Sequence, residues 1–158
     1  MNVKIVYSLT AQQEIAQLQS LLGRVSTDSA FSYVSECLSS IGTILHYLST
    51  DPKHIPAVYH VHKLWRDFKG YLGAYLEPSK HADGLNSHRM VFRVMSAESG
   101  FYGLDDPRFP WLRDRVGDLS TVDFVVHIWV GCFDYHTNIK SRSRSSVKRF
   151  VYAFLVFV

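Results

Sequence analysis

The chain has 158 residues, of which 47% are hydrophobic and 14% aromatic, enough to bury the core of one compact domain. Its formal net charge of +3 is only mildly basic, so the total charge predicts no nucleic-acid partner and the placement of the cations matters more. The two cysteines, Cys37 and Cys132, are far apart in sequence, which argues against a metal site or disulfide framework and favours a reducing cytoplasm. Because no secretory signal and no bilayer-spanning apolar run is evident, no membrane association is expected.

The first half of the chain predicts one strand and two helices. Residues 3–7 are rich in β-branched and aromatic side chains, as in strands. Thr10 and Gln13 form a capping-box pattern, and apolar residues at helical spacing continue to Gly23, a plausible C-terminal stop. A second helix follows after a short connection, which predicts an antiparallel hairpin. Its apolar positions, separated by three or four residues, are Phe31, Val34, Leu38, Ile41, Leu45 and Leu48.

The second half changes to the period of two that is typical of strands. Residues 71–76, 88–95 and 122–130 are the predicted strands, separated by residues 77–84 and by a longer segment, residues 96–120. The longer segment contains glycines and prolines but also several aromatic residues, so we expect a folded insertion that packs back onto the domain.

These elements predict an α+β fold in which an N-terminal strand and a helical hairpin pack on a small antiparallel sheet with a mixed edge. We expect a single domain over residues 1–158. Residues 150–158 are apolar on both faces of any strand, which predicts a C-terminal strand buried on both sides or at a subunit interface. Residues 140–149 place five cations in ten residues, either as a phosphate-binding arm or as a solvated basic loop.

Three segments occur in an order that resembles the RelE/ParE superfamily of bacterial toxins, especially its YoeB-like branch. They are residues 64–71 (LWRDFKGY), 85–94 (LNSHRMVFRV) and 132–136 (CFDYH). In that family a leucine and basic residues precede a Gly-aromatic pair, a strand carries a His-Arg-aliphatic-Val-aromatic core, and the last strand ends in Tyr-His. The opening strand and helical hairpin also resemble the family's N-terminus.

The resemblance implies the toxin component of a type II toxin–antitoxin system, a ribosome-dependent mRNA endonuclease that inhibits translation in the cytoplasm. The implied partners are a cognate antitoxin protein, the ribosome and mRNA. RNA cleavage by its own 2′-hydroxyl needs a base, an acid and a cation, so no metal or small-molecule cofactor is required. Two alternatives stay open: a non-enzymatic inhibitor of a large target such as DNA gyrase, and a catalytically inactive interaction protein of the same fold.

The candidate catalytic residues are Arg89, His136 and Tyr135. A guanidinium offers paired donors to phosphate, an imidazole titrates near neutrality, and a tyrosine can stack on a base. Strand alternation places Arg89, Val91 and Arg93 on one face. An RNA-cleaving site of this kind requires Arg89 and His136 to converge in space. Each candidate also has a structural explanation without function. Arg89 could lie on a solvated sheet face, His136 could be an exposed loop histidine, and Tyr135 could be a partly buried tyrosine of an edge strand.

A second group of candidates supplies cations for binding nucleic acid: Lys63, Arg66, Lys69, Arg93, Lys140, Arg142 and Arg144. The first three flank Trp65 and Phe68, a pattern that a packed aromatic face explains equally well.

The chain also departs from the family pattern. It contains the extra residues 77–84 and 96–120 and continues beyond the Tyr-His pair. No acidic residue matches the family position, Asp51 and Asp67 being the nearest, so no general base is assigned. Cys132 and Phe133 replace a basic residue of RelE-like relatives, which favours the Tyr-His arrangement.

Overall fold

The structure, a computed structural model, describes residues 1–24, 28–77 and 88–134. The sequence predictions for residues 135–158, and for all but the first residue of the 77–84 segment, lie outside this part. The elements in chain order are β1 (Val3–Tyr7), α1 (Leu9–Leu22), α2 (Asp28–Thr50), η1 (Ala57–Tyr59), β2 (His62–Lys63), η2 (Arg66–Phe68), β3 (Leu72–Tyr75), β4 (His88–Ser96), α3 (Leu112–Val116) and β5 (Phe124–Asp134).

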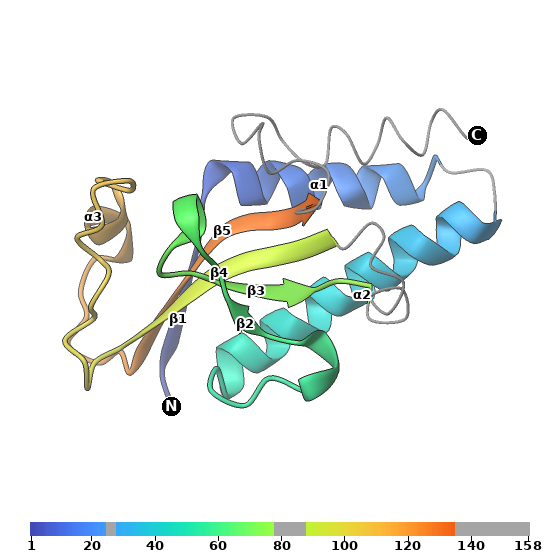
Figure 1. Cartoon of the computed structure of the whole chain (residues 1–158). Coiled ribbons are helices and arrows are strands. Elements are labelled where there is room, and N and C mark those ends of the chain that lie inside the picture. Colours follow the sequence, from blue (N-terminus) through green and yellow to red (C-terminus); the bar gives the residue numbers. More distant parts are fainter. Residues whose placement is uncertain (25–27, 78–87, 135–158) are drawn as a thin grey trace.

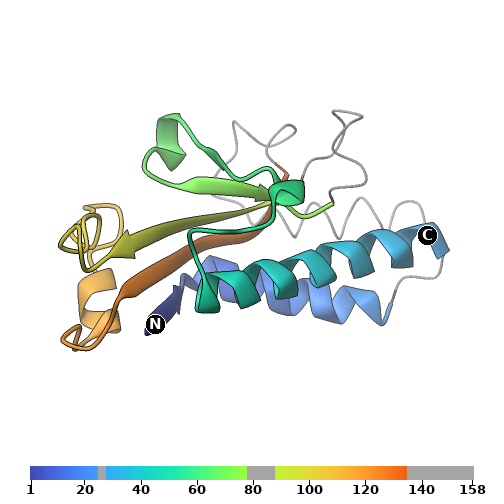
Figure 2. The ribbon, with the colours of Figure 1, turned by 90° about the horizontal axis from the view of Figure 1, so that it is seen from below.

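Within the described residues the strands form one sheet of five, in the order β1-β5-β4-β3-β2. β1 runs parallel to β5, and the other neighbours are antiparallel, so the mixed edge is β1. The long helices α1 and α2 lie side by side on one face of the sheet (Figures 1 and 2). The predicted α+β class is confirmed.

The first helix begins two residues earlier than the capping box predicted. Ser8, not Thr10, is the N-cap, and its Oγ accepts a hydrogen bond of 2.9 Å from the backbone N–H of Ala11. The same hydroxyl donates to the Trp129 carbonyl on β5 at 2.5 Å, a partner that sequence spacing does not reveal. The predicted stop at Gly23 is confirmed.

The second helix has the predicted length, but the side that it buries is rotated. Its fully buried core residues include Cys37 and Ile44, two positions outside the predicted stripe. Phe31, which opened that stripe, is 50% exposed, and Leu38 and Leu45 are only half-buried. The register of the helix against the sheet, not its own periodicity, selects the buried side.

The sheet separates two apolar cores. The core on the helix side joins α1 and α2 to residues such as Met90, Phe92 and Ile128. The opposite core joins alternate strand residues, including Tyr71 and Val91, to residues of the 96–120 segment. We call these two sides the helix face and the insertion face. The 96–120 segment packs on the second of them, near one end of β4 and β5 (Figure 2).

α1 is fixed to β5 at one close contact. A Cβ at Gly131 would lie 2.8 Å from Ile15 Cγ1 and 3.0 Å from the Ala11 carbonyl oxygen, so only glycine fits without a shift. The Gly131 N–H donates a hydrogen bond of 3.1 Å to Glu14 Oε1, which gives this buried carboxylate a backbone partner.

No helix in the described part of the chain is long and apolar enough to cross a membrane.

Candidate active site

Arg89 lies on the insertion face near the start of β4. Its register partner on β3 is Tyr75. Arg89 Nη2 donates a hydrogen bond of 2.8 Å to Tyr75 Oη, and Arg89 Cζ lies 4.7 Å from the centroid of the tyrosine ring. These contacts hold the planar guanidinium in one orientation. Because only 5% of Arg89 is exposed, its attraction to an anion is weakly screened by water.

His62 lies beside the same tyrosine, on the edge strand β2. Its ring centroid is 5.6 Å from that of Tyr75. The opposing strand residue is Gly73, where a Cβ would lie 3.4 Å from His62 Cε1 and 3.1 Å from Leu64 Cδ2. The missing side chain at Gly73 therefore leaves room for the imidazole against the sheet.

The pKa of His62 is lowered from its ordinary value of 6.5, chiefly because burial disfavours the charged ring. The charges of Arg89 and His60 lower it further, while a hydrogen bond to the His60 carbonyl opposes the shift. His62 is therefore predominantly neutral at pH 7. Sequence spacing did not single it out, since it is one of eight histidines and its contacts come from other strands.

The end of the last strand, β5, pairs with β4 at Arg89. Arg89 pairs with Phe133, and His88 pairs with Asp134, where the described part of β5 ends. Tyr135 and His136 are the next two residues of the chain and lie outside the described residues, as do Lys140, Arg142 and Arg144. The convergence of Arg89 with His136 stays a prediction, supported by the register that brings the preceding residues to Arg89.

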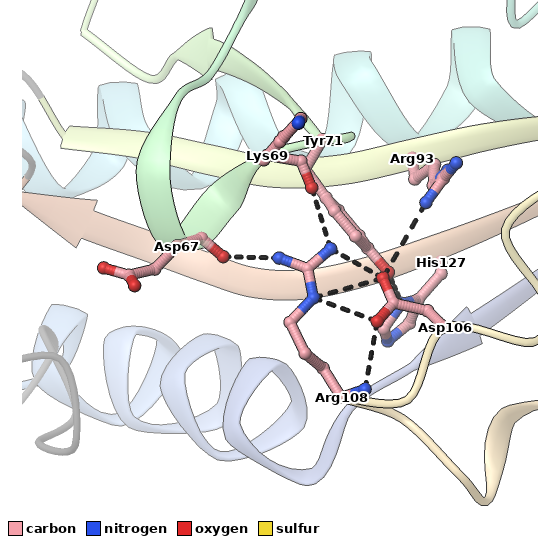
Figure 3. Close-up of polar contacts among 7 residues, drawn as sticks. All are labelled: Asp67, Lys69, Tyr71, Arg93, Asp106, Arg108 and His127. Atoms are coloured by element: carbon pink, nitrogen blue, oxygen red, sulfur yellow. Dashed lines mark hydrogen bonds and ion pairs between the residues drawn. The ribbon is translucent and has the colours of Figure 1, made fainter.

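Arg93, on the same face of the sheet as Arg89, pairs with the inserted segment (Figure 3). Its Nη1 is 3.8 Å from Asp106 Oδ2 of the inserted segment. Its Cζ lies 5.8 Å from the ring centroid of Tyr71 and 5.3 Å from that of Tyr102. A Cβ at Gly103 would lie 2.4 Å from Arg93 Cζ. Arg93 is thus enclosed by the inserted segment.

Arg108 ties the inserted segment to the loop before β3 (Figure 3). It pairs with Asp106 through an Nη2 to Oδ2 hydrogen bond of 2.6 Å and an Nε to Oδ1 hydrogen bond of 3.0 Å. Its Nη1 and Nη2 also donate to the backbone carbonyls of Asp67 and Lys69, at 2.5 and 2.7 Å. The pKa of Asp106 is lowered, mainly by its hydrogen bonds with Arg108, so it is a carboxylate at neutral pH.

Tyr71 and His127 form a buried polar pair beneath this network. Tyr71 Oη and His127 Nδ1 lie 2.5 Å apart, and the imidazole is packed edge-on against Phe109 and Trp111. Burial lowers the pKa of His127 to about 4, although Asp106 opposes the shift, and burial raises the pKa of Tyr71. Both groups are neutral at pH 7, so this pair supports packing rather than proton transfer near neutrality.

The cations predicted to bind nucleic acid before β3 flank an exposed aromatic residue in the sequence. Lys63, Arg66 and Lys69 are all exposed, and Trp65 is 69% exposed. Phe68 is buried, at 7% exposed, against Trp129. Phe68 therefore fits the interpretation of a packed aromatic face, whereas Trp65 is open to a partner.

A third polar group lies on the helix face and was missed because Glu77 was placed in a loop. Glu77 is fully buried and accepts a hydrogen bond of 2.5 Å from the His88 N–H. His88 Nδ1 lies 2.6 Å from Tyr33 Oη, and Cys37 Sγ donates to Glu77 Oε2 at 3.7 Å. Burial, followed by the charge of Glu77, raises the pKa of the Cys37 thiol well above its ordinary value, which makes it a poor nucleophile.

In the described residues no group of three or more histidines, cysteines, aspartates or glutamates could hold a metal ion. No family model, no curated protein and no solved structure matches this chain. The likeness to RelE/ParE toxins therefore stays a prediction that rests on the sequence motifs.

Proposed function

We propose that this protein is a metal-independent endoribonuclease of the toxin–antitoxin type that cuts mRNA on the ribosome. The observation that carries the proposal is the position of Arg89. Its guanidinium is fixed against Tyr75, the ring that also contacts the neutral His62, and Arg89 neighbours the end of β5 that precedes Tyr135 and His136.

The chemistry of these groups fits cleavage by the 2′-hydroxyl. Arg89 holds the scissile phosphate and stabilises the negative charge that develops on its oxygens. A fixed donor set acts strongly because it needs no rearrangement during the reaction. His136 follows β5 as the candidate acid that protonates the leaving oxygen, and Tyr135 stacks on a neighbouring base. The products are a 2′,3′-cyclic phosphate and a 5′-hydroxyl.

The exposed ring of Trp65 supports binding of single-stranded RNA. Aromatic rings that stack on bases and cations that contact phosphates are the usual combination in such sites. Lys63, Arg66 and Lys69 supply those cations on the segment that also carries His62. The partners of this function are the ribosome, mRNA and an antitoxin whose acidic segment covers the cations until it is removed.

The test is induced expression of the full chain in a bacterial host, with growth and mRNA integrity followed together. We expect growth arrest and new mRNA ends that appear only where ribosomes translate. Arg89→Ala should abolish both, whereas the control Arg113→Ala should abolish neither, since Arg113 makes its ion pair with the exposed Asp105. Arrest by Arg89→Ala equal to that by the wild type would refute the proposal.

The enclosure of Arg93 favours a second candidate, a non-enzymatic inhibitor of the same fold. The inserted segment occupies that part of the insertion face and presents Tyr102, which is 78% exposed, to solvent. An inhibitor of DNA gyrase would cause double-strand DNA breaks and leave mRNA intact. An interaction protein without either activity would produce neither effect.

A further inference from the structure

The proton acceptor for the proposed reaction has no match in the sequence motifs, and the surroundings of His62 identify one. His62 Nδ1 lies 2.7 Å from the backbone carbonyl oxygen of His60. A carbonyl oxygen can only accept, so Nδ1 carries the proton of the neutral ring. The lone pair then resides on Nε2, the atom that a general base requires.

The turn before β2 provides this orientation. His60 has a left-handed backbone conformation, with φ of 47° and ψ of 52°, and closes the short helix η1. Such a conformation is costly for a residue other than glycine and persists where the surrounding structure enforces it. Here it directs the His60 carbonyl toward the imidazole two residues later.

The groups around the ring keep it neutral and close to the phosphate ligand. Arg89 approaches from β4, His60 from the same segment, and Tyr75 packs against the ring from β3. Arg89 and His62 both contact Tyr75, and the charge of Arg89 acts on the imidazole, which is the basis for placing a phosphate bound to Arg89 near this ring. A neutral histidine next to a bound phosphodiester is the arrangement needed to activate a 2′-hydroxyl.

We propose that His62 is the general base that removes the 2′-hydroxyl proton of the nucleotide to be cut. The proton moves to Nε2 while the O2′–P bond forms and the P–O5′ bond breaks. The departing O5′ takes a proton from the acid, and the products are a 2′,3′-cyclic phosphate and a 5′-hydroxyl. His62 then releases its proton to water and the acid takes one up, which restores the starting protonation state. The proposal rests on the proposed nuclease function and assigns it one further catalytic residue.

The test measures single-turnover cleavage of ribosome-bound mRNA by the full chain between pH 5.5 and pH 8. We expect His62→Ala and the size-matched His62→Gln to cleave about 100- to 10,000-fold more slowly, the usual cost of losing a general base. At the acidic end of this range the wild-type rate should rise with pH, with the midpoint of the rise below pH 6.5 because the pKa of His62 is lowered, and both variants should lose this rise. Added imidazole should restore part of the activity of His62→Ala.

The matched control is His54→Ala. His54 is also a histidine held through Nδ1, but it is largely exposed and its partner is Asp51. The His54→Ala variant should cleave at the wild-type rate. The unfolding midpoint of each variant, measured by circular dichroism, shows that the fold is retained.

The outcomes separate the two proposals. If Arg89→Ala abolishes cleavage while His62→Ala cleaves within a few-fold of the wild type, His62 is not the base although the nuclease function stands. If His62→Ala is slow but keeps the wild-type pH profile and gains nothing from imidazole, the role of His62 is structural and the proposal fails. If the wild type cuts no RNA, the nuclease function and the role of His62 fail together.

Discussion

Arg89 and Arg93 are on the same strand and the same face of the sheet, yet they lie in different surroundings. Arg89 stacks on Tyr75 and lies near His62, while Arg93 is paired with Asp106 and enclosed by Tyr71 and Tyr102. The inserted segment pairs the carboxylate of Asp106 with Arg93, while Arg89 contacts the hydroxyl and the ring of Tyr75 on β3. An arginine already neutralised by a carboxylate gains little from binding phosphate, so Arg93 is suited to stability and the proposed phosphate ligand is Arg89.

The largest expected difference comes from removing each arginine in turn. Arg89→Ala should lower the cleavage rate by roughly 100- to 1,000-fold, as for loss of a transition-state donor. Arg93→Ala should lower the free energy of unfolding instead and change the rate by less than about 10-fold, since it leaves Asp106 without one of its partners. Single-turnover cleavage and urea unfolding of both variants measure the contrast. Equal effects of both variants on both quantities would remove the distinction.

The next largest expected effect is a loss of stability at acidic pH, which arises from His127 beneath the inserted segment near Arg93. The pKa of His127 is about 4 in the folded protein and 6.5 as a free side chain, so the unfolded state binds more protons between these pH values. The stability from neutral His127 is complete above pH 6.5 and is lost as the pH falls to about 4. It amounts to about 3 kcal/mol by proton linkage. Urea unfolding at pH 7.5 and pH 4 should show this component in the wild type.

His127→Gln is the control for that experiment, because an amide does not titrate. The wild type should lose about 3 kcal/mol more than this variant over the same pH range. Identical pH dependence in the two proteins would show that protonation of His127 does not weaken the packing under the inserted segment.

A smaller effect should follow from Asp106→Asn, which keeps the shape of the side chain and removes its charge. Asp106 is 8% exposed at its side chain and pairs with both Arg93 and Arg108. We expect a loss of about 2 kcal/mol in the free energy of unfolding, typical of a charged hydrogen-bond network. Asp105→Asn is the matched control, with a change below about 1 kcal/mol, since its pair with Arg113 is at the surface. Differential scanning calorimetry compares the two.

The smallest expected effect on stability comes from a substitution at Gly73, close to His62 and Tyr75. Gly73→Ala places a methyl group 3.1 Å from Leu64 Cδ2, which must move by a few tenths of an ångström. The same methyl group lies 3.4 Å from His62 Cε1, where it fills the space beside the imidazole. We expect cleavage to fall several-fold while stability changes by less than about 1 kcal/mol. Gly42→Ala in α2 meets no atom within 4 Å and should leave cleavage unchanged. A Gly73→Ala protein as active as the wild type would show that the position of His62 is not critical.

The sequence was most informative where local pattern decides structure. Strand alternation correctly placed Arg89 and Arg93 with Val91 on one face, and the boundaries of α2 and β4 are close to those predicted. These features depend on neighbours within a few residues along the chain.

The sequence was least informative where partners come from distant segments. The cap at Ser8 and the contacts of His62 and Glu77 involve strands far along the chain. β2 has only two residues, too few for a periodic signal. Whether an arginine on β4 pairs with Tyr75 or with Asp106 likewise depends on how the inserted segment packs. A short window of sequence does not contain that information.

The position of β5 between β1 and β4 governs when the domain can be completed during synthesis. β1 is hydrogen-bonded through Asn2 to Asp123, a sequence separation of 121 residues. A sheet with such distant pairing has a high contact order, so it forms slowly and only after the distant strand is available. While the ribosome is still making the chain, α1 and α2 can pair with each other but β1 has no neighbour strand. β1 therefore gains its neighbouring strand only after the ribosome has synthesised β5.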